Sequence, residues 1–263
     1  MPLYVNDPVA VTAEGTPVRI VRNAETNLGD LCADAYRALS NADIAFVNGG
    51  GIRKQIEAGD ITLDDIYSVH PFGNTMCVIR VTGQQVLDAL EWGARAVPSE
   101  NGGFLQVSGL TYEIHTGVAS SAEKDENGMF TRVSGEYRVK NVMVGGQPLE
   151  LDKTYTLASH NYMLLNHGDG YTMFDGCEVL GEDMMIDNQV LITYITTTLG
   201  GVVGEQYANP YGDGRIVAVP VATYSGTASA IYYNCSLMAD IGLMDTAKPA
   251  ADDDYTLGRD EPF

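Results

Sequence analysis

The chain has 263 residues, of which 45% are hydrophobic and 19% charged, a composition typical of a globular protein with one sizeable core. Its 15 lysines and arginines are outnumbered by 35 aspartates and glutamates, giving a formal net charge of −20. Such a surface repels nucleic-acid backbones and anionic membranes, so we expect neither as a partner. No apolar run reaches the roughly 18 residues of a membrane span. Residues 1–5 lack the features of a signal peptide, so any export signal is expected upstream.

The four cysteines are Cys32, Cys77, Cys177 and Cys235. They form no CxxC pair and have no histidine at zinc-ligand spacing, which argues against a structural zinc site. Isolated buried thiols are the favoured interpretation, although the sequence leaves long-range disulfides open. The redox compartment therefore stays undetermined.

The first part of the chain has a clear helix and a clear strand. Apolar residues at helical spacing predict a helix over residues 27–40, with Thr26 or Asn27 as its N-cap. Residues 42–47 are typical of a short buried strand, which runs into a glycine-rich turn at 48–53.

Strands and helices then follow in mixed order. Thr82-Gly83-Gln84-Gln85 is a capping-box pattern that opens a helix over residues 86–96. Gly145-Gly146-Gln147-Pro148 is typical of a hairpin turn. Further strands are predicted over residues 69–81 (with a loop in the first half), 105–115, 132–144 and 155–159, and a further helix over 188–199. Because no strict βαβ repetition occurs, the pattern favours a layered α+β domain over a doubly wound sheet.

The texture of the sequence changes after residue 217, where small and polar residues precede a short helical pattern and an acidic run. We therefore place a boundary near residues 220–226. The predicted organisation is one domain over residues 1–219, followed by a linker and a short additional segment over residues 220–263.

Two arginines are candidate anion ligands. Arg22 lies just before a helix N-terminus, and Arg53 ends the glycine-rich turn that contains Gly50 and Gly51. Arginine offers a forked donor to phosphate, and glycines allow backbone N–H groups to approach a ligand closely. The plainer alternatives are an exposed Arg22 paired with Glu25 and an ordinary turn.

Two loops offer candidate contacts for a planar ligand and its sugar. Phe72 lies between a proline and a glycine, where core packing is difficult, so its ring is a candidate for stacking. Asp169 lies between two glycines, and a carboxylate there can accept hydrogen bonds from two ribose hydroxyls. A loop aromatic that packs back on its own domain, and an Asx-type turn, are the alternatives.

Four motifs occur in one order: Glu25-Thr26-Asn27-Leu28-Gly29, Asn48-Gly49-Gly50-Gly51-Ile52-Arg53, Pro71-Phe72-Gly73-Asn74 and Gly168-Asp169-Gly170-Tyr171. This series resembles the C-terminal domain of the 5′-nucleotidase family, which includes ecto-5′-nucleotidases and bacterial UDP-sugar hydrolases. The likeness covers about residues 5–218, including a closing Gly212-Asp213-Gly214-Arg215-Ile216.

The resemblance implies a layered α/β/β/α sandwich that binds the nucleoside part of a nucleotide. The base would lie between two aromatic rings, and the remaining ligand contacts would be polar. The implied substrate-binding residues are Phe72 and Tyr162 for the base, Asp169 and Asn48 for the ribose, and Arg22 and Arg53 for phosphate, with Gly50 and Gly51 in the same loop.

Two departures from the family pattern concern the second loop. The second aromatic residue normally lies six positions before the loop aspartate, whereas Tyr162 lies seven before Asp169. Either the loop has one extra residue or Met163 takes the stacking position. His167 stands where the family commonly has glycine, and it would either narrow the pocket or point to solvent.

The resemblance does not extend to catalysis. In the family, an N-terminal metallophosphatase domain holds two divalent metal ions through Asp-x-His, Gly-Asp-x-x-Asp and Gly-Asn-His-Asp/Glu motifs, none of which occurs here. Hydrolysis of this kind needs both ions to hold the attacking and leaving oxygens. We therefore expect no cofactor, no catalytic residue and no metal in this chain, with the metal-bearing domain as its partner in the parent protein.

Residues 230–263 resemble the opening of an S-layer homology repeat, the kind of module that anchors proteins to Gram-positive cell walls. This implies an extracellular or wall-associated parent protein with a cell-wall polymer as a further partner. The main alternative to a nucleotidase is a non-catalytic nucleoside-binding module of a wall-anchored surface protein. A third hypothesis is a structural cell-wall protein that retains the fold but whose pocket no longer binds a ligand.

Overall fold

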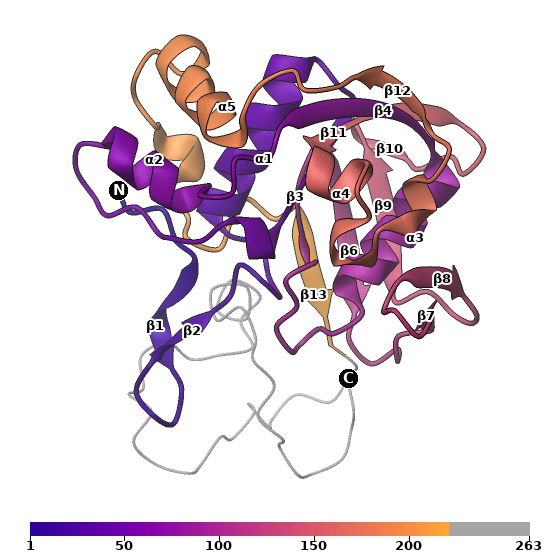
Figure 1. Ribbon diagram of the computed structural model, residues 1–263. Coiled ribbons are helices and arrows are strands. Elements are labelled where there is room, and N and C mark those ends of the chain that lie inside the picture. Colours follow the sequence, from indigo (N-terminus) through magenta and orange to yellow (C-terminus); the bar gives the residue numbers. More distant parts are fainter. Residues whose placement is uncertain (221–263) are drawn as a thin grey trace. The chain divides into compact units, whose positions relative to one another are not determined.

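The structure is a computed structural model, in which residues 1–220 are described. The predicted S-layer-like segment therefore lies outside the described residues, and the domain boundary near residue 220 stays a prediction. Within residues 1–220 the chain combines helices with two larger sheets (Figure 1), which confirms the α+β class. In this part of the chain, no helix is both long and apolar enough to cross a bilayer.

The central sheet has five strands. In spatial order they are β12 (Glu178–Gly181), β4 (Met76–Thr82), β11 (Thr154–His160), β3 (Ile44–Asn48) and β5 (Leu105–Ser108). β11 and β3 are parallel neighbours, while the other pairs are antiparallel. All residues of β3 and β5 are buried, as expected for strands with both faces covered.

Three helices cover one face of this sheet: α1 (Asn27–Ser40), α2 (Leu63–Val69) and α5 (Asp187–Thr193) (Figure 1). The Thr26 hydroxyl accepts a hydrogen bond from the Gly29 N–H at 3.0 Å, which confirms Thr26 as the N-cap of α1. Leu28 and Leu31 of α1 pack with Ala45 and Val47 of β3 in one fully buried core.

The other face of the central sheet carries a second core, formed with α3 (Gly83–Ala94) and a four-stranded sheet. That sheet has the order β10 (Gln147–Pro148), β9 (Val139–Val144), β6 (Leu110–His115) and β13 (Ile216–Val219). Thr82 and Gln85 form the predicted capping box at the start of α3. Trp92 of α3 is completely buried in this core, beside Phe130.

Shorter elements complete the domain. The hairpin of β1 (Asn6–Val11) and β2 (Pro17–Arg19) projects from it (Figure 1), and a second hairpin joins β7 (Ala122–Lys124) and β8 (Phe130–Val133). A short helix, α4 (Asn161–Leu164), directly follows β11. The single-turn helices are Gly49–Gly51, Gly168–Gly170, Thr172–Phe174 and Glu205–Tyr207, with a π-helical turn at Tyr194–Thr198.

Several predicted elements have different limits in the structure. The segment 69–81 is a strand only from Met76, because Val69 still belongs to α2 and the residues between them connect this helix to β4. The predicted strand 105–115 is two strands in different sheets, and Gly109 turns the chain between them at φ +80°. The hairpin turn at Gly145 and Gly146 is confirmed. Cys32 and Cys77 are buried free thiols and Cys177 is a half-buried one, whereas Cys235 lies outside the described residues.

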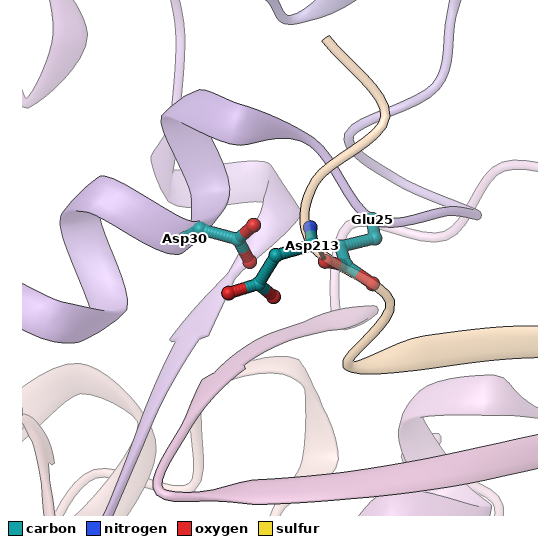
Figure 2. A group of neighbouring side chains, drawn as sticks. All are labelled: Glu25, Asp30 and Asp213. Carbon is teal, nitrogen blue, oxygen red and sulfur yellow. Dashed lines mark hydrogen bonds between the residues drawn. The ribbon is translucent and has the colours of Figure 1, made fainter. Parts of the chain in front are cut away.

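A charged cluster, which we call the latch, joins the start of α1 to the segment before β13. Figure 2 shows its carboxylates Glu25, Asp30 and Asp213 facing one another. Glu25 accepts hydrogen bonds from three backbone N–H groups of this segment, those of Asp213, Gly214 and Ile216, at 2.7–3.0 Å. The latch therefore fixes the closing segment against the loop that leads into α1.

Arg215 neutralises much of the latch. Its guanidinium lies 2.6 Å from Asp34, 2.8 Å from Asp213 and 3.5 Å from Asp30. Burial raises the pKa of Glu25, and burial together with the charge of Glu25 raises that of Asp30 well above its usual range. The latch thus combines two buried carboxylates, Glu25 and Asp30, with the exposed Asp213, and Arg215 is its cation.

Candidate binding pocket

A pocket of about 370 Å³ opens at the carboxyl ends of the parallel strands β3 and β11. This edge is where ligands commonly bind in sheets with parallel strands, because loops from neighbouring strands converge there. The pocket brings together all eight sequence-predicted residues and two others; its lining is Arg22, Asn48, Gly50, Gly51, Arg53, Phe72, Asn74, Gly102, Tyr162 and Asp169.

The lining residues come from separate elements. Asn48 ends β3, and Arg53 follows the glycine turn next to it. Phe72 lies in the loop between α2 and β4, while Tyr162 belongs to α4, immediately after β11. Residues more than 100 positions apart in sequence are thus placed around one hollow.

The two arginines are the cationic part of the pocket. Within residues 1–220, neither Arg22 nor Arg53 forms an ion pair, and Arg22 Nε is buried without a hydrogen-bond partner. Burial, followed by the positive charges of Arg19 and Arg53, lowers the pKa of Arg22. The predicted alternative partner, Glu25, is instead in the latch. An anion between the two guanidinium groups would relieve this repulsion.

The start of α1 has a different role from the one predicted. No residue of α1 lines the pocket, and Glu25, Thr26 and Asn27 are all buried. Thr26 caps the helix, and the Asn27 side chain donates to the Pro2 and Tyr207 carbonyls. The helix N-terminus is therefore part of the frame, and only Arg22 from this region reaches the pocket.

The glycine turn also differs from expectation. Two of its backbone N–H groups are used inside the protein, because Gly49 donates to the Phe104 carbonyl and Gly50 to the Gly102 carbonyl, both at 2.7 Å. A Cβ on Gly50 would lie 2.9 Å from the Gly102 oxygen. These two glycines mainly allow close backbone packing, and their N–H groups are not available to a ligand.

Asp169 presents the carboxylate of the pocket. Its residue adopts a left-handed conformation (φ +56°), and the Trp92 indole N–H donates to its carbonyl oxygen at 2.9 Å. Asn48 Nδ2 donates to one carboxylate oxygen at 2.6 Å, and the Tyr162 hydroxyl donates to the other at 3.2 Å. Side-chain and backbone contacts thus fix the direction of this carboxylate before any ligand binds.

Two aromatic rings are exposed at the pocket. Phe72 is 60% exposed and Tyr162 is 39% exposed, so both rings are accessible from the pocket that they line. The Arg53 guanidinium lies 5.7 Å from the centroid of the Phe72 ring. The loop aromatic therefore does not pack back into the domain core.

Tyr162 and Met163, the two candidates for the second stacking residue, lie in different environments. Met163 is completely buried in the core, whereas Tyr162 lines the pocket. The Tyr162 ring packs on Gly168, where a Cβ would come within 2.4 Å of the ring carbons. His167 is not among the lining residues and pairs with Asp175 instead, so it does not narrow the pocket.

Sequence reasoning missed two lining residues, Asn74 and Gly102. Asn74 belongs to the Pro71–Asn74 motif, so its position in that motif was an available signal. Its backbone is held by Asp187, which accepts the Asn74 N–H at 3.2 Å and donates its own N–H to the Asn74 carbonyl at 2.8 Å. No local pattern marks Gly102, which reaches the pocket through its hydrogen bond with Gly50.

Neither of two other features of residues 1–220 resembles this pocket. A larger hollow of about 620 Å³ is lined mostly by residues of apolar type, and Asp60 is the one ionisable side chain among its lining residues. The latch carboxylates Glu25, Asp30 and Asp213 are close enough to share a cation, but the Arg215 guanidinium already lies among them. Charged and aromatic groups gather instead in the pocket of Arg22, Phe72 and Asp169.

The fold thus places cationic, aromatic and carboxylate side chains around one hollow. Residues 8–176 match the family described as "5'-nucleotidase, C-terminal domain". The chain belongs to this family, as its motif series predicted.

Relatives agree with this assignment. The chain is 35% identical over 207 residues to "Trifunctional nucleotide phosphoesterase protein YfkN" of Bacillus subtilis, covering 77% of the chain and 13% of that protein. It is 35% identical over 178 residues to a "5'-nucleotidase" of Vibrio parahaemolyticus, covering 67% and 28%. The crystal structure of a "5'-nucleotidase precursor" from Thermus thermophilus is similar with a TM-score of 0.63 and 32% identity, covering 76% and 36%. The chain thus spans about a third or less of each of these proteins.

Proposed function

We propose that this domain binds nucleoside 5′-phosphates for a two-domain, metal-dependent 5′-nucleotidase. The observation that carries the proposal is the pair Arg22 and Arg53, which line a pocket without ion-pair partners in the described part of a chain with a net charge of −20. Leaving two arginines unneutralised among so many carboxylates makes physical sense where a ligand supplies the negative charge.

The ligand roles follow from the chemistry of each wall. The flat base lies between Phe72 and Tyr162, since stacking on exposed rings tolerates any base. The Asp169 carboxylate, supported by Asn48, accepts hydrogen bonds from the ribose hydroxyls. The two arginines bind phosphate oxygens.

Hydrolysis is assigned to the partner domain. The pocket has one carboxylate, Asp169, beside two arginines, and this donor set is poorly suited to holding two divalent ions. The two metal ions of the nucleotidase reaction therefore belong to an upstream metallophosphatase domain of the parent protein. Among the relatives, the names "5'-nucleotidase" and "nucleotide phosphoesterase" support this class of reaction. We propose an extracellular setting for the parent protein, and a wall-anchored binding module as the alternative.

Calorimetric titration of the 263-residue chain with adenosine, AMP and UMP tests the proposal. We expect binding of all three, with AMP tighter than adenosine because only AMP engages the arginines. The matched control is Phe72→Ala, which removes one stacking ring at an exposed position. Heats for the wild-type chain no larger than those of Phe72→Ala would refute nucleotide binding at this pocket.

A further inference from the structure

A buried histidine stands behind the Asp169 carboxylate. His160 is the last residue of β11 and is 2% exposed, so it does not itself line the pocket. Its Nε2 lies 3.0 Å from Asn48 Oδ1, and Asn48 Nδ2 lies 2.6 Å from Asp169 Oδ2. A continuous hydrogen-bonded chain therefore runs from His160 through Asn48 to Asp169.

The Asp169 carboxylate decides which groups donate and which accept in this series of hydrogen bonds. A carboxylate only accepts hydrogen bonds, so Asn48 must present its NH₂ group to Asp169 and its oxygen to His160. The imidazole must then donate from Nε2. Burial, with a smaller contribution from nearby His70, lowers the pKa of His160 to about 3, so the ring is neutral near pH 7 and carries one proton. Nδ1 has no hydrogen-bond partner among the described residues, in keeping with this tautomer.

His160 also supports the second contact to Asp169. Its ring centroid lies 5.9 Å from that of Tyr162, whose hydroxyl donates to the other carboxylate oxygen. The glycine turn leaves room for this arrangement, because a Cβ on Gly51 would lie 2.6 Å from Asn48 Oδ1. Both oxygens of Asp169 are thus held by residues that contact His160.

We infer that His160 is a positioning residue that fixes the Asn48 amide and thereby aims the Asp169 carboxylate at a vicinal diol. The inference rests on the proposed function, and it makes the His160 hydrogen bond a determinant of selectivity for ribonucleotides over 2′-deoxyribonucleotides. A side chain that only filled space in the core would have no influence on that selectivity.

The test compares two variants at this position in the 263-residue chain. His160→Gln keeps a donor that can reach Asn48, whereas His160→Leu removes the donor and keeps an apolar side chain of similar size. Calorimetric titration gives the ratio of dissociation constants for 2′-deoxy-AMP and AMP. We expect about a tenfold preference for AMP in the wild type, as for loss of one hydrogen bond to a charged group. His160→Gln should retain this preference, and His160→Leu should bring it close to one.

The outcomes separate the two proposals. If the wild type binds neither nucleotide, the proposed function fails. If it binds both and His160→Leu keeps the full preference for AMP, only the role of His160 fails. Should His160→Leu not fold, ¹⁵N NMR of the wild type decides instead. We expect His160 to stay protonated at Nε2 and bare at Nδ1 from pH 5 to pH 8, and a proton on Nδ1 or a titration in that range would overturn the inference.

Discussion

The latch and the pocket begin three residues apart in the sequence, at Glu25 and Arg22. They differ in whether their charged side chains have partners within the protein. In the latch, Arg215 pairs with Asp30, Asp34 and Asp213, and backbone N–H groups satisfy Glu25. In the pocket, Arg22 and Arg53 have no ion pair within residues 1–220. The latch charges thus have partners within the protein, whereas under the proposed function the partner of Arg22 and Arg53 is the ligand.

We therefore expect substitutions in the latch to change the free energy of unfolding, and substitutions in the pocket to change the affinity for nucleotides. The largest effect is expected for Arg215→Met. Removing the guanidinium leaves the largely buried Asp34 carboxylate without its bidentate partner, which costs about 3–5 kcal/mol of the free energy of unfolding. Urea denaturation followed by circular dichroism measures this loss.

The matched control is Arg132→Met, because Arg132 forms a solvent-exposed ion pair with Glu123. Solvent screens such exposed pairs, so this variant should unfold close to the wild type. Equal losses for the two arginine variants would contradict the role given to the latch.

Arg22→Met tests the cationic side of the pocket. We expect the dissociation constant for AMP to rise about 10- to 100-fold, as for loss of a charge-assisted hydrogen bond, while adenosine binding stays unchanged. The free energy of unfolding should change little, because Arg22 has both repulsive neighbours, Arg19 and Arg53, and attractive ones, Glu100 and Asp169. Calorimetry with both ligands and urea denaturation give these values. A loss of stability without a loss of AMP affinity would show that Arg22 supports the fold and does not bind the ligand.

Phe72→Ala tests the stacking wall. Its ring is 60% exposed, so we expect the free energy of unfolding to change by no more than about 0.5 kcal/mol. Loss of one stacking contact should weaken adenosine and AMP by the same factor, about tenfold. Unequal effects on the two ligands, measured by calorimetry, would show that Phe72 acts on phosphate and not on the base.

The smallest expected effect is the pH dependence of Asp30→Asn. Burial and Glu25 raise the pKa of Asp30, so the folded chain holds a proton that the unfolded chain releases above about pH 3.9. The stability linked to this proton is complete below that pH and is lost as pH rises through the raised folded-state pKa. Asparagine has no such proton. Urea denaturation from pH 4 to pH 9 should therefore show that the free energy of unfolding of the variant increases relative to that of the wild type as pH rises. A difference that does not change with pH would contradict the raised pKa of Asp30.

Much of this fold could be predicted because local signals agreed with the tertiary structure. The helix from Asn27 to Ser40 was predicted with its exact limits, since a Thr26 cap and apolar spacing mark both ends. The edges of other elements were misjudged where tertiary contacts decide. β5 and β6, for example, are separated in sequence by Gly109 alone but belong to different sheets.

The pocket residues could be found only through the motif series, because no single residue points to a ligand. The same series also contains residues that only support the fold. Gly29 is one, since a Cβ there would lie 2.1 Å from the Gln106 amide oxygen. His160 carried no signal at all, because its role depends on a hydrogen bond to Asn48 from a neighbouring strand. Sequence motifs mark both regions, and only geometry separates ligand contacts from support.

A crystal structure of the 263-residue chain with AMP would show directly whether the pocket binds a nucleotide. We predict the base between Phe72 and Tyr162, the ribose hydroxyls on Asp169, and phosphate oxygens on Arg22 and Arg53. AMP bound elsewhere, or bound with its phosphate turned away from both arginines, would contradict it.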